Sequence, residues 1–263
     1  NEKSRLISFD PNTGHFEPYP ESELGNPLSE SIPYYIEESR NGDLWIGTNN
    51  GLIKIDRQSN TRVAFKANEK ESKYGLKGNT ILVIAEDKDG LIWVGTNNGL
   101  SKVDPEANTI TTYEPEKHGL ASSIVCGIVP DEFGNLWVST YYGISYFDRE
   151  KDEFHNFFYS DGFSNDEFNR FSFYRDKNGR YYFGGVNGLN TFHANDLLTE
   201  EKIPTVALSK IVRLNSREEG LITKYDQLNP LKTIVITPQD LYFQLHFMLP
   251  KFKDPDRNQF KTW

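Results

Sequence analysis

The sequence is poor in sulfur-containing residues, with one cysteine and one methionine among 263 residues. A single cysteine cannot form an internal disulfide, so no disulfide framework holds the fold together. Cys126 stands in the apolar stretch 124–128, which predicts a small buried hydrophobic residue rather than a nucleophile. The chain begins at Asn1 and its methionine is Met248, so we expect a fragment or a processed product, with any signal peptide or anchor outside it.

Long apolar runs and an excess of positive charge are also lacking. No run approaches about 18 apolar residues, so the sequence predicts no membrane-spanning helix and no membrane contact by these residues. Acidic residues outnumber basic ones by 38 to 29, which gives a net charge of −9. This balance argues against broad binding to nucleic acids or anionic membranes.

Catalytic and metal-binding signatures are sparse. The five histidines stand apart, none at metal-ligand spacing to another histidine or to the cysteine: His15, His118, His155, His193 and His246. Neither a Gly-x-Ser-x-Gly elbow nor a phosphate-binding glycine loop is found. We therefore expect no cofactor, no metal site and no enzymatic activity in this chain.

One acidic motif lies just before Trp93. Residues 87–90, Asp-Lys-Asp-Gly, resemble the Asp-box of sialidases, but the spacing from either Asp to Trp93 is six or four residues rather than five. We expect these carboxylates to cap a turn instead.

The sequence contains one segment that occurs in four similar copies, at 41–56, 89–104, 133–148 and 178–193. The aligned aromatic residues, at steps of 48, 44 and 45, are Trp45, Trp93, Trp137 and Tyr182. A period in the forties is the length of one four-stranded propeller blade. The sequence therefore predicts an all-β fold built of β-propeller blades.

The first copy shows how each repeat is built. An Asn-Gly turn precedes the strand 44–48, Asn-Asn-Gly then makes a hairpin, and the strand 52–56 returns. Gly47 and Gly95 lie beside a Trp within a strand, so we expect a ring of the neighbouring blade to pack on the backbone there. With an inner and an outer strand added, the blades span about 31–66, 79–114, 123–159 and 168–193.

The ends of the repeat region differ from its middle. Residues 1–19 match the second half of a repeat, a half blade, and the repeats as a whole occupy 1–200. The fourth repeat lacks an outer strand, which residues 14–19 or a segment outside the chain could supply. Residues 201–263 change to short alternating strands, at 206–212, 233–236 and 241–247, typical of a β-sandwich that is truncated at the end of the chain.

The order of the strands predicts which face of the blades binds a ligand. In an antiparallel blade that runs from inside to outside, the Asn-Asn-Gly turns share a face with the connections to the next blade. Those connections are long, at 66–79, 114–122 and 159–169. Long loops on a rigid scaffold usually carry recognition, so we expect ligand binding on this face.

The repeated phrase LWIGT-NNGL-x-x-x-D resembles the regulator-propeller repeats of bacterial two-component sensors. Residues 161–189 resemble the closing repeat of such propellers, and the segment from Pro204 onward resembles the immunoglobulin-like domain that follows them. The resemblance implies a periplasmic, homodimeric receptor whose blades belong to a seven-bladed propeller. It also implies that the sandwich domain relays an oligosaccharide signal to a membrane-anchored histidine kinase or cyclic-dinucleotide synthase.

Candidate ligand-binding residues lie mainly around the third and fourth repeats. Tyr141 and Tyr142 replace Asn-Asn in the third turn, and their flat faces and hydroxyls suit sugar rings; packing against a neighbouring blade is the alternative. Arg170 is a planar fork suited to a carboxylate or sulfate, with a salt bridge to Asp166 or Glu167 as the alternative.

Further candidates come from the long connections. Phe163, Asn165 and Asn169 belong to the same loop as Arg170, and His118 stands in the connection after the second repeat. Lys73 lies in a locally basic loop that could contact an acidic polysaccharide, although a solvated charge run is the alternative.

Three classes of function follow from these observations. The first is an extracytoplasmic sensor module that binds an oligosaccharide without chemistry. The second is a propeller lyase resembling streptogramin B lyases, which share Trp-containing repeats punctuated by glycine. The third is a protein-interaction scaffold, since propeller faces also bind peptides. The appended sandwich segment favours the sensor.

Overall fold

The structure is a computed structural model, and it describes residues 6–18, 31–59, 61–67, 75–198, 207–215, 221–224 and 238–248. The chain divides into two compact units, Asn1–Leu198 and Thr199–Trp263. Strands dominate both units, and the predicted all-β class with propeller blades is confirmed. The number of blades in a complete ring stays a prediction.

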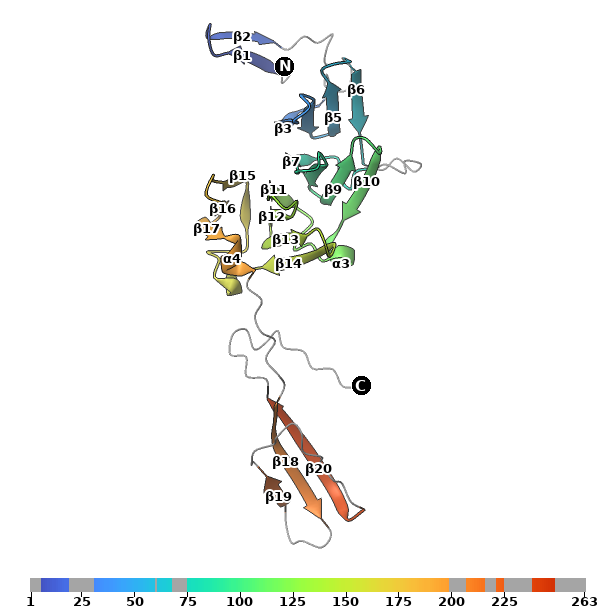
Figure 1. Cartoon of the computed structure of the whole chain (residues 1–263), viewed down its shortest axis with the longest axis vertical. Helices are drawn as coiled ribbons and strands as arrows, with labels where there is room; N and C mark the ends of the chain where they lie inside the picture. The colour runs from blue at the N-terminus through green and yellow to red at the C-terminus, as the bar shows by residue number, and fades with distance from the viewer. Residues whose placement is uncertain are drawn as a thin grey trace. The chain divides into compact units, whose positions relative to one another are not determined.

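Three successive repeats each form a four-stranded antiparallel sheet whose strands follow one another from the inside to the outside (Figure 1). The first sheet is β3 (Pro33–Glu38), β4 (Leu44–Thr48), β5 (Gly51–Asp56) and β6 (Thr61–Phe65). The second is β7 (Ile81–Glu86), β8 (Ile92–Thr96), β9 (Gly99–Asp104) and β10 (Thr109–Tyr113). The third is β11 (Val125–Pro130), β12 (Leu136–Thr140), β13 (Ile144–Asp148) and β14 (Glu153–Phe157).

The sheets at the two ends of the first unit have fewer strands. The fourth repeat forms β15 (Phe168–Arg175), β16 (Arg180–Gly185) and β17 (Gly188–His193), with no fourth strand beside β17 among the described residues. β1 (Ile7–Asp10) and β2 (His15–Pro18) pair with each other as a hairpin. Because β2 pairs with β1, it does not supply the outer strand of the fourth blade in this structure.

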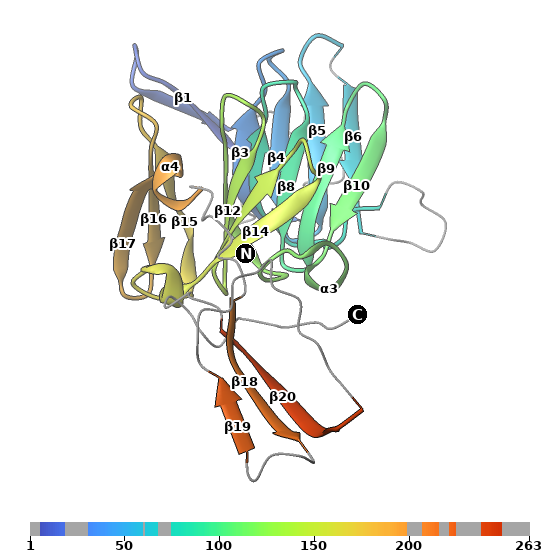
Figure 2. The same ribbon diagram turned by 60° about the horizontal axis from the view of Figure 1, so that its bottom comes forward.

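The inner strands β3, β7, β11 and β15 contact their neighbours in that order. The blades pack face to face, as Figure 2 shows for the sheets that carry β4 and β8. The cores therefore lie between blades. Trp93, Tyr113 and Phe147 share one core between the second and third blades, and Trp137 and Phe183 share the next. All five residues of β7 from Ile81 to Ala85 are buried, because neighbouring blades cover both of its faces.

Glycines in the second strand of the first and second blades allow this close approach. A Cβ on Gly47 would lie 2.7 Å from a side-chain carbon of Ile81, and one on Gly95 would lie 2.5 Å from Val125. The expectation of close packing is confirmed, but the expectation of an aromatic ring is wrong at both positions, where aliphatic side chains fill the space. A ring of the next blade packs closely on Gly127, which Phe173 of the fourth blade contacts.

Helical segments in the described parts of the chain are short. They are α3 (Pro115–His118), the 3₁₀ turn η1 (Tyr159–Asp161) and α4 (Ala194–Leu197). Within the described residues, no helix has the length and apolar character that a bilayer crossing requires.

The second unit contains one antiparallel sheet in the order β19–β18–β20. Its strands are β18 (Ala207–Asn215), β19 (Leu221–Lys224) and β20 (Asp240–Met248). Two of these match the strands expected at 206–212 and 241–247, whereas β19 was not expected. The strand expected at 233–236 lies outside the described residues, and the sandwich architecture stays a prediction.

Candidate functional site

Backbone hydrogen bonds define the face that carries the long connections. The amides of Gly51 and Gly99, in the hairpin turns, donate to the carbonyls of Asn79 and Ser123 at 2.7 and 2.6 Å. Those carbonyls belong to the connections that enter the next blade. The turns and the long connections therefore share one face, as the strand order predicts, and we call it the long-loop face.

Arg170 and Tyr141 meet on the long-loop face between the third and fourth blades. The guanidinium carbon of Arg170 lies 5.6 Å from the centre of the Tyr141 ring, a cation–π geometry. No carboxylate of the described residues forms an ion pair with Arg170, so the alternative of a salt bridge to Asp166 or Glu167 is not observed. Arg170 is exposed, and its guanidinium lies beside an aromatic ring.

The strand that carries Arg170 is irregular. β15 pairs with β16 at Phe168 and resumes pairing only at Phe173, so the residues between them leave the ladder. Phe171 has a φ of 59° and is 53% exposed, and its ring stacks on Tyr35 of the first blade at 6.2 Å. An exposed aromatic residue with positive φ is strained, and such strain clusters at ligand-binding sites.

The remaining tyrosine of the third turn is accessible from solvent. Tyr142 is 57% exposed, and its ring packs on Phe158 at 5.2 Å. Its backbone amide donates to Thr140 Oγ1 at 3.0 Å, which holds the turn in place although tyrosine is a poor turn former. Asn169, which precedes Arg170 in the chain, is also exposed.

Two other candidates support the loop from within. Phe163 is only 6% exposed and packs edge-on against Phe168 and Phe192, so its ring belongs to the core and offers no surface to a ligand. Asn165 accepts the backbone amide of Glu167 at 2.9 Å through its side-chain oxygen. Sequence alone placed both in a polar loop, but the loop folds its aromatic residue inward.

The last two candidates are not joined to this surface. His118 ends α3, where its Nδ1 accepts the backbone amide of Glu114 at 3.0 Å and its ring lies against Tyr113. No contact links His118 to Arg170 or Tyr141 in the described part of the chain. Lys73 lies outside the described residues.

Residues missed by the sequence analysis are Phe171 and Tyr35. Their contact joins the first and fourth blades, which are more than 100 residues apart in the sequence. The only signal in the sequence was an aromatic residue next to Arg170. Its exposure depends on the break in the β15 ladder, which the strand pattern does not reveal.

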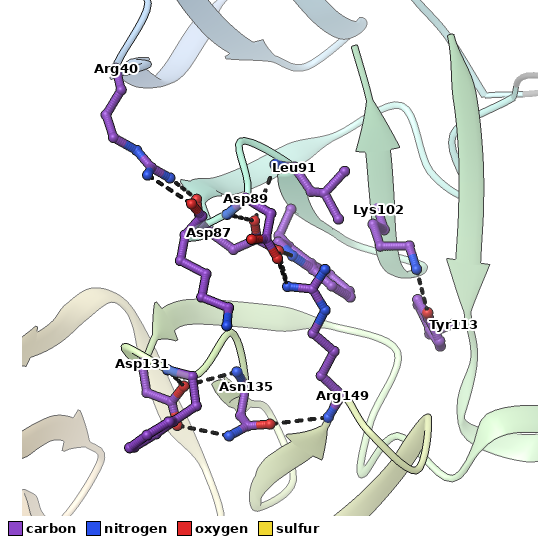
Figure 3. Close-up of polar contacts among 12 residues, drawn as sticks. Arg40, Asp87, Asp89, Leu91, Lys102, Tyr113, Asp131, Asn135 and Arg149 are labelled. Atoms are coloured by element: carbon purple, nitrogen blue, oxygen red, sulfur yellow. Dashed lines mark hydrogen bonds and ion pairs between the residues drawn. The ribbon is translucent and has the colours of Figure 1, made fainter. Parts of the chain in front are cut away.

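The opposite face carries short turns, and we call it the turn face. In the second blade, Asp87 Oδ1 accepts the amides of Asp89 and Leu91 at 2.9 and 3.1 Å, and Oδ2 accepts the Trp93 indole N–H at 2.9 Å (Figure 3). The prediction that this carboxylate caps a turn is confirmed. Asp131 caps the corresponding turn of the third blade in the same way.

Arginines on the turn face tie consecutive blades together. Arg40 of the first blade donates to the carbonyls of Asp87 and Lys88 in the second, and Arg149 of the third blade pairs with Asp89 (Figure 3). Arg175 of the fourth blade likewise pairs with Glu132 of the third. Each of the three junctions between consecutive blades thus has an arginine that binds the neighbouring blade on this face.

Signs of catalysis are weak in the described residues. No group of three or more histidine, cysteine or carboxylate side chains among them is placed to hold a metal ion. Burial raises the pKa of the Cys126 thiol to about 12, so the thiolate is not accessible near neutral pH. Cys126 is fully buried, as the sequence predicts.

Comparison with known families finds one match. Residues 27–50 and 75–98 match the family model of the two component regulator propeller. No curated protein sequence matches the chain.

Comparison with solved structures shows a shared fold at low sequence identity. The chain is similar to the extracellular domain of the putative hybrid two component system BT4673 from B. thetaiotaomicron, with 21% identity and a TM-score of 0.51 over 74% of this chain and 31% of that one. It is similar to PorZ, a surface component of the type-IX secretion system of Porphyromonas gingivalis, with 14% identity and a TM-score of 0.58 over 94% and 42%. It is also similar to virginiamycin B lyase from Staphylococcus aureus, with 18% identity and a TM-score of 0.53 over 76% and 65%. The chain thus spans about a third of the length of the BT4673 domain.

Proposed function

Because this chain carries two-component regulator propeller repeats, we propose that it is the ligand-sensing part of an extracytoplasmic receptor. The ligand binds on the long-loop face, between the third and fourth blades. The chain performs no chemistry on the ligand; it reports occupancy. The expected location is the periplasm.

The observation that carries this proposal is Arg170 over the ring of Tyr141 without an ion pair to any carboxylate of the described residues. A guanidinium that is not neutralised by the protein keeps its planar fork of donors for a ligand. The ring beneath it fixes the orientation of that fork. A structural arginine in an acidic chain would instead be expected to find one of the nearby carboxylates, as Arg149 and Arg175 do.

The surroundings of Arg170 favour an acidic oligosaccharide as the ligand. Tyr142 and Phe171 are exposed rings that can stack on the apolar faces of sugar units, and Asn169 offers an amide for hydroxyl groups. The arginine would bind a carboxylate or sulfate substituent. A neutral oligosaccharide could use the rings but would leave the guanidinium unmatched.

The signal would pass from the blades to the second unit, and from there to a membrane-anchored histidine kinase or cyclic-dinucleotide synthase in a homodimeric receptor. Ligand can shift such a receptor only by the difference in its affinity for the two signalling states. A contact such as Phe171 on Tyr35, which joins the first and fourth blades, is a plausible element for such a difference.

Calorimetric titration of the chain with a short oligogalacturonate and a short cello-oligosaccharide tests the proposal. We expect saturable binding of the acidic oligosaccharide, weakened at least roughly tenfold in Arg170→Ala because one charge-assisted contact is lost. Tyr141→Ala should weaken binding as well. Arg57→Ala is the matched control, since Arg57 is an exposed arginine that pairs with Glu38.

Other outcomes would point to other functions. The fold likeness to virginiamycin B lyase makes a propeller lyase the second candidate, and formation of an unsaturated or cleaved product in the same titration would favour it. Binding that is equally strong in Arg170→Ala and the parent chain would contradict the proposed site. Binding of peptides but not of saccharides would favour an interaction scaffold.

A further inference from the structure

A cavity of about 430 Å³ opens on the turn face between the first and second blades. This volume falls within the range of small-molecule sites. Trp45, Leu91 and Ile92 form its apolar part, and the first two turns supply its polar walls. The cavity lies on the face opposite to the site proposed above and shares no residue with it.

The first blade departs from the other blades at this cavity. Its turn reads Ser39-Arg40-Asn41-Gly42-Asp43, whereas the second reads Asp87-Lys88-Asp89-Gly90-Leu91. The carboxylate has therefore moved from the first position of the turn to the fifth. The first position holds Ser39, whose hydroxyl donates to the backbone carbonyl of Asp43 at 3.0 Å.

The relocated carboxylate forms a buried ion pair in the cavity wall. Asp43 Oδ2 lies 2.9 Å from Lys54 Nζ, and the exposed fractions of the two side chains are 5% and 19%. Burial of an ion pair carries a desolvation cost that its attraction often fails to repay. The second blade builds the same turn around Asp87, whose cation partner Arg149 belongs to the third blade and lies 3.9 Å away, so the turn itself does not require a lysine of its own blade at 2.9 Å.

The pair leaves a free acceptor beside free donors. Asp43 Oδ2 accepts from Asn41 Nδ2 and Lys54, while Oδ1 has no hydrogen bond from any described residue. Lys54 has three N–H groups and lies 5.6 Å from the centre of the Trp45 ring, so donors remain for a bound molecule. The side chains of Lys88 and Glu106 in the cavity lining form no ion pair with described residues either.

A ligand for this cavity must satisfy carboxylate oxygens and ammonium groups side by side. Hydroxyl groups do both, because each donates one hydrogen bond and accepts others. Neighbouring hydroxyls of a sugar can donate to Asp43 and accept from Lys54, with the half-buried Leu91 against the apolar face. The lining carries five carboxylates and three cations, so an anionic sugar is disfavoured: Asp43, Glu86, Asp89, Asp104 and Glu106 against Arg40, Lys54 and Lys88.

From this geometry we infer that the cavity between the first two blades is a second binding site, for a neutral monosaccharide unit held by Asp43 and Lys54. It differs from the long-loop site in face, residues and ligand charge. The two proposals therefore stand or fall separately.

The test titrates the chain with methyl glucopyranoside, methyl galactopyranoside and methyl mannopyranoside, using saturation-transfer NMR and tryptophan fluorescence. We expect saturable binding of at least one glycoside and a loss of at least roughly tenfold in affinity in Lys54→Met. The matched control is Lys102→Met, since Lys102 occupies the equivalent place over Trp93 but does not line the cavity.

A double variant separates binding from folding. Ser39→Asp with Asp43→Leu gives the first turn the residues of the second at these positions, where the carboxylate caps the turn by accepting two backbone amides. We expect this variant to unfold at a similar temperature and to lose glycoside binding. Failure of all three glycosides to bind the parent chain, or unchanged binding in the double variant, would overturn the site. Binding of glycine or alanine in place of the glycosides would overturn the ligand class, because a zwitterion also matches a mixed charge set.

Discussion

At the scale of single residues, one position of the repeat shows how neighbouring blades constrain each other. In the second blade, Gly95 pairs with Val83, whereas in the third blade Ser139 occupies the same place and pairs with Gly127. The member of the pair that is larger than glycine lies in the first strand of the second blade (Val83) but in the second strand of the third blade (Ser139). The pair thus keeps one small member in both blades, although no single position is invariant.

Equivalent alanine substitutions should therefore have opposite effects. Gly95→Ala places a Cβ 2.5 Å from both Val83 and Val125, and we expect a loss of about 1–3 kcal/mol in the free energy of unfolding. Ser139→Ala removes a buried hydroxyl that has no hydrogen-bond partner among the described residues, so we expect no loss or a gain of up to about 1 kcal/mol. Urea unfolding followed by tryptophan fluorescence measures both, and similar losses in the two variants would contradict this account.

A second residue-scale prediction concerns Glu37 in β3. Burial, and then the charge of nearby Glu86, raise the pKa of the Glu37 carboxyl above its ordinary value. The folded state therefore favours the protonated form, so ionised Glu37 lowers stability at neutral pH. The stabilising contribution of protonated Glu37 therefore grows as the pH falls through the pKa of the folded state. It is complete below the pKa of the unfolded state.

We therefore expect Glu37→Gln to raise the urea midpoint at pH 7 and to leave it unchanged below about pH 4. The control is Glu38→Gln, because Glu38 is exposed and pairs with Arg57 at the surface. A midpoint difference for Glu37→Gln that is equal at both pH values would show that the charge is not responsible.

At the scale of elements, the turns between the first two strands of each blade rest on one side chain. Asp87, Asp131 and Asp176 each accept two backbone amides of their own turn. The second carboxylate oxygen has different partners in these turns. Asp87 accepts from the Trp93 indole, whereas Asp131 accepts from Asn135, and the Trp137 indole has no hydrogen-bond partner in the described part of the chain. The same turn conformation is thus combined with different side-chain hydrogen bonds to the second carboxylate oxygen.

The loss of stability on removing one of these carboxylates should be larger where the carboxylate is more deeply buried. Asp87→Ala leaves two amides and the Trp93 indole without an acceptor in a buried place, and we expect a loss of about 2–4 kcal/mol. Asp176→Ala affects an exposed turn and should cost less, because water replaces the carboxylate there. Thermal unfolding compares the two, and a larger effect of Asp176→Ala would contradict the importance of burial.

At the scale of the first unit, stability is expected to be highest in its middle. β7 and β11 are buried along nearly their whole length, whereas β3 alternates and β15 is largely accessible. In a stacked array each blade is stabilised mainly by its neighbours, so the terminal blades have one partner and the middle blades two.

Native-state hydrogen exchange should show this order. We expect amides of β7, β8, β11 and β12 to exchange at least roughly tenfold more slowly than those of β3, β15 and β17. Destabilising the fourth blade by Phe183→Ala should accelerate exchange in the third blade more than in the first. Uniform protection across the four blades would indicate a single cooperative unit instead.

The sequence by itself determined the blades, their order and the character of their two faces. Glycine turns, Asn-Asn-Gly hairpins and alternating apolar residues act within one repeat, where local chemistry suffices to position strands. The role of Asp87 as a turn cap and the burial of Cys126 could be predicted for the same reason.

Only the tertiary structure decided which side chains of different blades meet. Arg170 on Tyr141, Phe171 on Tyr35 and the cavity beside Asp43 all join residues from separate repeats. Their approach depends on how the blades pack and on a break in the β15 ladder with a positive φ at Phe171. The inward turn of Phe163 has the same origin, because a loop residue is buried only when a neighbouring core offers it space.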